Sequence, residues 1–196
     1  ETGEIVDNCQ KRPHRLFEER ELTVEECKDY LLRAVNILRE RRPDVKVIIT
    51  VSPIRYAKYG FHGSQLSKAT LLLAADQLIK ETTLNRESSI DKELNFSKES
   101  SISKESSISK ESSISKEISF NEEQGGAVVT YFPAYEIVND ELRDYRFYAD
   151  DMLHPSSLAV EYIWQRMVET FFSDEAKTFL REWAPLKKGF SHRPLN

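Results

Sequence analysis

The fold of this 196-residue chain is constrained most by the order of its hydrophobic patterns. Thr23-Val-Glu-Glu26 fits a capping box, and apolar residues then recur at helical spacing up to about Arg41, before Pro43. The β-branched run Val45–Val51 has the length of a strand buried on both faces, as in a parallel sheet. A helix followed directly by a buried strand predicts an α/β fold.

The same order continues further along the chain. A helix is predicted from about Ser64 to Lys80, and a second hydrophobic strand over Ala127–Phe132. Ser156 and Ser173 are placed to cap two closing helices, the second of which is expected to end near Trp183. Since ligands gather at the carboxyl ends of parallel strands, we expect the loop Ser52–Gly63 and the segment after the second strand to share one edge of the sheet.

A low-complexity insertion interrupts the domain between the second helix and the second strand. Three consecutive units in residues 99–116 read Glu-Ser-Ser-Ile-Ser-Lys. A six-residue period scatters their isoleucines around a helix, and the serine-rich, charged composition buries too little apolar surface to order itself. We therefore expect a disordered or loosely helical insertion over 87–126, with a β-stacked repeat as the alternative, between domain parts 1–86 and 127–196.

Charge and composition exclude several classes of protein. The net charge of −5 argues against general binding to nucleic acid, which needs a clustered basic face. No apolar run approaches the roughly 18 residues of a membrane span. The two cysteines, Cys9 and Cys27, have neither metal-site nor disulfide-scaffold spacing, so we expect a reduced cytoplasmic protein, with a disulfide between them or a signal peptide as alternatives.

The segment from Tyr131 to Pro155 carries the strongest functional pattern, because it gathers aromatic, basic and acidic residues ahead of an Asp-x-x-His-Pro ending. Asp151 and His154 lie three apart, so in a turn the carboxylate can meet one imidazole nitrogen and hold the other toward a substrate. This is the base half of a hydrolytic triad. Two alternatives are that His154 only packs or caps at the start of the next helix, and that Asp150, Asp151 and His154 bind a metal.

Four motifs carry a resemblance to a known family: this segment, Thr50–Arg55, Gln65–Thr70 and Ser191–Pro194. Together they resemble the GSCFA domain family, a bacterial branch similar to the SGNH (GDSL-type) hydrolases. The resemblance implies a partial flavodoxin-like (SGNH-type) α/β/α sandwich, interrupted by the insertion. It also implies a serine hydrolase, without metal or cofactor, in which His154 is the general base, Asp151 orients it, and a small-molecule or carbohydrate ester is the substrate.

One part of the family pattern does not occur in this sequence. The family is named for a Gly-Ser-Cys-Phe-Ala block, whose serine is the presumed nucleophile. We therefore interpret the chain as the C-terminal portion of such a domain, nearly inactive alone. Ser52 and Ser64 are alternative nucleophiles, although turn formation and helix capping explain both. A second hypothesis is a catalytically inactive module that binds a ligand or carbohydrate, and a third is an interaction protein whose repeat is the functional part.

The substrate-binding candidates are Arg55, Ser52 and Arg143. Arg55 follows a Ser-Pro turn at a strand end, where its guanidinium can bind a substrate carboxylate or form a salt bridge to Glu136 or Asp144. We favour the salt bridge. Arg143 can line a pocket or pack against neighbouring aromatic residues. The family usually has a histidine directly after the arginine that corresponds to Arg55, whereas this chain has Tyr56 there.

Overall fold

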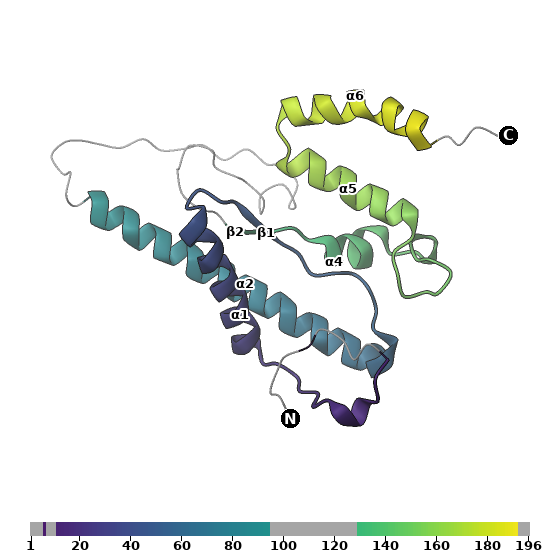
Figure 1. Cartoon of the computed structure of the whole chain (residues 1–196), viewed down its shortest axis with the longest axis horizontal. Helices are drawn as coiled ribbons and strands as arrows, with labels where there is room; N and C mark the ends of the chain where they lie inside the picture. The colour runs from purple at the N-terminus through teal and green to yellow at the C-terminus, as the bar shows by residue number, and fades with distance from the viewer. Residues whose placement is uncertain (1–5, 7–10, 95–128, 192–196) are drawn as a thin grey trace.

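The computed structural model describes Val6 and residues 11–94 and 129–191. Its centre is a parallel pair of strands, β1 (Val47–Ile49) and β2 (Val129–Tyr131), in register with Val47 opposite Val129. The helices α1 (Val24–Arg41) and α2 (Gly60–Leu94) lie on one side of this pair, and α5 (Ser157–Phe171) lies on the other (Figure 1).

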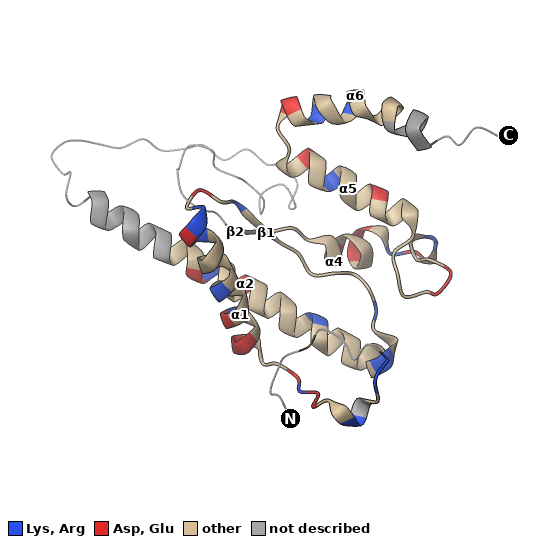
Figure 2. Ribbon diagram, viewed as in Figure 1, with Lys and Arg blue, Asp and Glu red and all other residues tan. Residues whose placement is uncertain are grey.

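The first helix begins and ends as the sequence predicts. The Thr23 hydroxyl accepts a hydrogen bond from the Glu26 amide at 3.2 Å, and the Glu26 carboxylate accepts one from the Thr23 amide at 2.9 Å, which confirms the capping box. Acidic residues occupy the first turn of α1 and basic residues the last, so both ends complement the helix dipole (Figure 2).

The first strand is shorter and less buried than predicted. It spans only the middle of the run Val45–Val51, and the prediction that it is buried on both faces was wrong, since Ile48 is 38% exposed. Side chains alternate along a strand, so Val47 and Ile49 pack toward α1 and α2 while Ile48 points the other way. The described residues form a parallel pair of strands with flanking helices, and the α/β sandwich stays a prediction.

The second helix is longer than predicted at both ends. A short 3₁₀ turn, η2 (Ala57–Tyr59), leads into α2 at Gly60, which has a positive φ of 69°, so the expected loop ends before Gly63. The helix then continues past Lys80 to Leu94, because no glycine or proline occurs between residues 64 and 124 to end it. Residues 87–94 of the predicted insertion thus belong to α2, and the remainder lies outside the described residues.

Two apolar clusters hold these elements together. The first joins α1, α2 and β2 through Val35, Leu78 and Val129. The second lies after β2, where Phe132 meets Phe171 of α5 edge to face, with ring centroids 5.8 Å apart. The chain between Phe132 and α5 is built from short helical turns: α4 (Ala134–Glu136), the π-helical η3 (Ile137–Leu142) and the 3₁₀ turn η4 (Tyr145–Phe147).

The two closing helices are capped as predicted. The Ser156 hydroxyl accepts from the Ala159 amide at 3.3 Å, and the Ser173 hydroxyl accepts from the Ala176 amide at 3.2 Å. The last helix, α6 (Asp174–Ser191), continues beyond the predicted end near Trp183. It contains Pro185, which removes one helical N–H donor without ending the helix. A short 3₁₀ turn, η1 (His14–Leu16), precedes α1.

Candidate active site

The Asp-x-x-His motif lies in a loop closed by main-chain hydrogen bonds. The amide of Ala149 donates to the carbonyl of His154 at 2.8 Å, and the amide of Ser156 donates to the carbonyl of Phe147 at 2.8 Å. Met152, between the two motif residues, adopts a left-handed backbone with φ of 59°. Few residues other than glycine adopt this conformation, so the surrounding hydrogen bonds impose it on Met152.

The side chains of Asp151 and His154 meet inside this loop. Asp151 Oδ2 lies 2.6 Å from His154 Nδ1, and Asp151 Oδ1 accepts hydrogen bonds from the amides of Leu153 at 2.9 Å and His154 at 3.0 Å. The two amides, together with the imidazole, lower the pKa of the Asp151 carboxyl to about 2. An ionised carboxylate only accepts, so Nδ1 carries the proton of a neutral imidazole and Nε2 is left as the acceptor.

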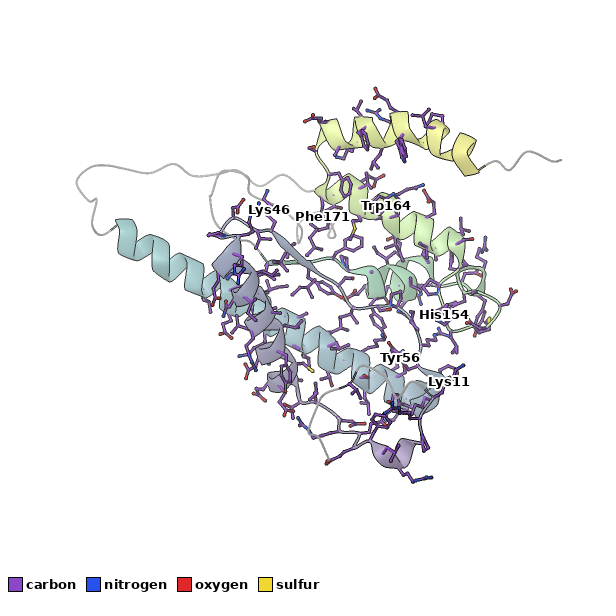
Figure 3. All side chains as sticks on the ribbon, in the orientation of Figure 1. Lys11, Lys46, Tyr56, His154, Trp164 and Phe171 are labelled. Atoms are coloured by element: carbon purple, nitrogen blue, oxygen red, sulfur yellow. The ribbon has the colours of Figure 1, made fainter. Side chains whose placement is uncertain are left out.

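This pair is open to a ligand and is connected to the first motif loop. About half of each side chain is exposed, 56% for His154 and 46% for Asp151. The amide of Arg55 donates to the carbonyl of Leu153 at 3.1 Å, so the loop after β1 touches the turn that carries the pair. Tyr56 follows Arg55 and His154 follows Leu153, and the two lie near one another in Figure 3. The prediction that both motif loops share one edge is confirmed.

Arg55 is held by an aromatic residue and not by a carboxylate. Its guanidinium lies over the ring of Tyr148, 4.1 Å from the centroid, and donates to the Tyr148 hydroxyl at 2.7 Å. The predicted salt bridge was wrong, because both expected partners are engaged elsewhere: Glu136 accepts from the Tyr131 hydroxyl, and Asp144 pairs with Arg146 at 3.0 Å. Within the described part of the chain, Arg55 has no ion-pair partner, so it keeps donors for a ligand.

The two candidate serines hold the loop after β1 in place. The Ser52 hydroxyl accepts from the Ile54 amide at 3.3 Å, and the buried Ser64 hydroxyl accepts from the Tyr56 amide at 3.1 Å. Ser52 therefore stabilises a turn, as the sequence predicted. The helix-capping explanation for Ser64 was wrong, because Ser64 lies inside α2 and its hydroxyl holds the loop ahead of the helix. Arg143 occupies a left-handed turn after η3, with φ of 45° and an exposed side chain. The structure brings Asp151, His154 and Arg55 into one region, and no described contact joins Ser52 or Arg143 to the pair.

The chain matches the GSCFA family over residues 1–86 and 98–167, which is most of its length. The chain belongs to the GSCFA family. The match contains the motif at Thr50–Arg55, the motif at Gln65–Thr70 and the Asp-x-x-His segment, but not Ser191–Pro194, and it resumes within the predicted insertion. Neither the curated proteins nor the solved structures gave a match.

Sequence reasoning placed Lys68 in a motif of this GSCFA chain and gave it no role. The structure buries it on α2, one helical turn after Ser64, with only 4% of its surface exposed. Its ammonium lies 5.0 Å from the centroid of the Tyr56 ring, and burial lowers the pKa of the Lys68 amine. Ser64 and Lys68 are four residues apart in α2, so both side chains lie on the helix face that meets the loop after β1.

The described residues lack a metal-binding constellation and a membrane span. They contain no group of three histidine, cysteine or acidic side chains arranged to hold an ion. In the same residues, no helix is both long enough and apolar enough to cross a bilayer. Cys27 is a free thiol whose pKa is raised by burial, and the alternative of a disulfide to Cys9 lies outside the described residues.

Proposed function

We propose that this GSCFA chain supplies the acid–base half of a serine-type ester hydrolase. The observation that carries the proposal is the 2.6 Å contact between His154 Nδ1 and Asp151 Oδ2, together with the two main-chain amides that fix Asp151. These contacts hold the imidazole in one tautomer and one orientation before any substrate arrives. That is the task of the carboxylate in a serine–histidine–aspartate site.

The proposed reaction uses His154 twice. In the first step, Nε2 takes the proton of a serine hydroxyl as the serine oxygen attacks the ester carbonyl carbon, and the imidazolium then gives that proton to the departing alkoxide. In the second step, Nε2 takes a proton from water, whose oxygen attacks the acyl-serine ester, and returns it to the serine oxygen. Asp151 remains ionised throughout and stabilises the imidazolium.

In this proposal the serine belongs to the family's Gly-Ser-Cys-Phe-Ala block, which the printed sequence does not contain. The proposed frame is an SGNH-type α/β/α sandwich, and the proposed substrate is an ester of a small molecule or carbohydrate. Two observations support this frame. The strands β1 and β2 are parallel, and the loops that leave their carboxyl ends are joined by the hydrogen bond from Arg55 to Leu153. In parallel sheets this edge is where ligands bind.

The test is hydrolysis of a short-acyl 4-nitrophenyl ester by the protein made from the complete reading frame that encodes this chain. His154→Ala should abolish turnover, whereas His62→Ala, at an exposed position of α2, should leave it unchanged. Equal turnover in the His154→Ala variant and the unaltered protein would reject His154 as the base. Labelling by a serine-reactive fluorophosphonate, lost in the same variant, checks the covalent step independently of the ester chosen.

A second candidate function is ligand binding without catalysis. It is favoured by one observation: no hydrogen bond among the described residues joins a serine hydroxyl to His154, and four of those hydroxyls accept from main-chain amides elsewhere. This candidate expects the complete protein to bind an ester or carbohydrate with the same affinity before and after His154→Ala, and to show neither turnover nor fluorophosphonate labelling.

A further inference from the structure

Among the side chains of α2 that the structure describes, three polar ones are buried, and one of them differs from the other two. Ser64 accepts a hydrogen bond from the Tyr56 amide, and the Thr82 hydroxyl donates to the Leu78 carbonyl at 2.9 Å. The ammonium of Lys68 has neither a hydrogen bond nor an ion pair within the described residues, and it lies over the face of the Tyr56 ring. Lys68 is thus a lysine whose side chain is almost fully covered and for which the described structure supplies no anion.

Such a position is unfavourable for a lysine that has only a structural task. Burial without a partner penalises the charged form, and the lowered pKa of Lys68 reflects this penalty. A ring face compensates only part of the lost hydration. Leucine or methionine would fill the same space on α2 without the penalty. A bound anion would account for the charge.

The surroundings place this cation next to the proposed reaction site. The Tyr56 amide is bonded to Ser64, one helical turn before Lys68, and the preceding residue, Arg55, is bonded to Leu153 beside His154. The loop after β1 therefore lies between Lys68 and the Asp151–His154 pair. Tyr56 is 50% exposed, and the Lys68 ammonium lies over its ring, so the ring contacts Lys68 and also has part of its surface in solvent.

We propose that Lys68 and the ring of Tyr56 form an anion-binding subsite that takes a carboxylate on the acyl part of the ester substrate. This inference rests on the proposed function and names its substrate class: a monoester of a dicarboxylic acid. A single ammonium with three N–H donors matches a single negative charge. The ligand carboxylate displaces the Tyr56 ring from the ammonium, and the ester carbonyl then lies across the loop, on the side of His154.

The test compares two nitrophenyl esters of equal acyl length with the complete protein: 4-nitrophenyl pentanoate, and mono-4-nitrophenyl glutarate corrected for its uncatalysed hydrolysis. Loss of one charge-assisted contact should lower kcat/KM for the glutarate ester about 10- to 100-fold in Lys68→Met and leave the pentanoate ester unchanged. Lys68→Arg keeps the charge and should retain part of the preference. Equal rates on the glutarate ester in the unaltered protein and Lys68→Met would overturn the subsite.

A binding measurement separates this inference from the hydrolase proposal. Glutarate added to the His154→Ala protein should shift the Cε and Nζ resonances of Lys68 in NMR spectra, and calorimetry should lose the binding in Lys68→Met. Shifts at Lys68, together with no hydrolysis of either ester by the unaltered protein, would reject the hydrolase and keep the subsite. Turnover of both esters with unmoved Lys68 resonances would reject the subsite and keep the hydrolase. The NMR readout needs no substitution at Lys68, so it decides even where Lys68→Met does not fold.

Discussion

The core beside the strands and the loop that holds Asp151 and His154 are stabilised in different ways. In the core, Val35, Leu78 and Val129 are almost fully buried and pack side chain against side chain. In the loop, most of the motif side chains are exposed, and main-chain hydrogen bonds set the geometry. Apolar packing therefore provides stability in one region, whereas hydrogen bonds provide precision in the other. Substitutions in the two regions should separate these effects.

The largest effect is expected from Asp151→Asn. The amide of asparagine offers an N–H to His154 in place of a lone pair, which favours the wrong imidazole tautomer, so kcat in the complete protein should fall by about 10³- to 10⁴-fold. The melting temperature should fall only modestly, because the asparagine oxygen can still accept from the amides of Leu153 and His154. The matched control is Asp150→Asn, one residue earlier and exposed, with unchanged kcat. A loss of activity in both variants would contradict the assignment of Asp151.

The converse result is expected in the core. Leu78 is fully buried between α1 and β2, so Leu78→Ala removes packing and leaves a cavity, which should lower the free energy of unfolding by about 2–5 kcal/mol. Leu73→Ala, on the same helix but 53% exposed, should change it by less than about 0.5 kcal/mol. Denaturant titration measures both. Similar values for the two variants would show that α2 does not pack against the strands as described.

Arg55 and Tyr148 connect the two regions. A double-mutant cycle measures the coupling free energy between their side chains. The guanidinium both stacks on the ring and bonds its hydroxyl, so Arg55→Lys with Tyr148→Leu should show a coupling of about 1–2 kcal/mol in the free energy of unfolding. Tyr148→Phe removes the hydroxyl alone and should retain about half of the coupling. Additive effects of the first two substitutions would mean that the stack contributes nothing to stability.

The helix cap should give a smaller effect, confined to stability. Thr23→Ala removes the hydroxyl that accepts from the Glu26 amide and should lower the free energy of unfolding by about 1 kcal/mol. Thr83→Ala is the control, since its hydroxyl bonds only a carbonyl of its own helix and alanine favours helix, so stability should stay constant or rise slightly. Thermal unfolding by circular dichroism compares them. Equal losses would argue against the capping box.

The smallest effect is an acid titration. Because the folded-state pKa of Asp151 lies at about 2, below its ordinary value of 3.8, its contribution to stability is present above about pH 4 and is lost as pH falls toward 2. Carbon-13 NMR of the Asp151 carboxyl should therefore show a midpoint near 2. A midpoint at the ordinary value would mean that the amides of Leu153 and His154 do not hold the carboxylate in solution.

The core was the easier part to predict from sequence. Thr23, Glu26 and the apolar spacing after them determine α1 by local chemistry, and the same holds for the serine caps of α5 and α6. The length of α2 was missed because the helix continues where no glycine or proline ends it. The spacing of apolar residues does not show how far such a helix extends. Ile48 was misjudged because a β-branched run does not reveal how many neighbours a strand has.

In the site, the spacing of Asp151 and His154 was sufficient to predict their contact, because the hydrogen-bonded turn is local. The partner of Arg55 could not be found from sequence spacing, since Tyr148 lies 93 residues away. The carboxylates of Glu136 and Asp144 were equally plausible partners for a guanidinium. Lys68 was missed for a related reason. A lysine in a helical motif is normally solvated, and only the packing of Tyr56 over α2 shows that this one is buried.

The hydrogen bond from the Arg55 amide to the Leu153 carbonyl has an evolutionary consequence. It joins main-chain atoms, so no side-chain replacement at either position removes it, except proline at residue 55. Side chains of the loop after β1 can therefore be exchanged without disturbing the main-chain link to the turn that holds Asp151 and His154. The turn with Asp151 and His154 can thus stay constant while its neighbours change.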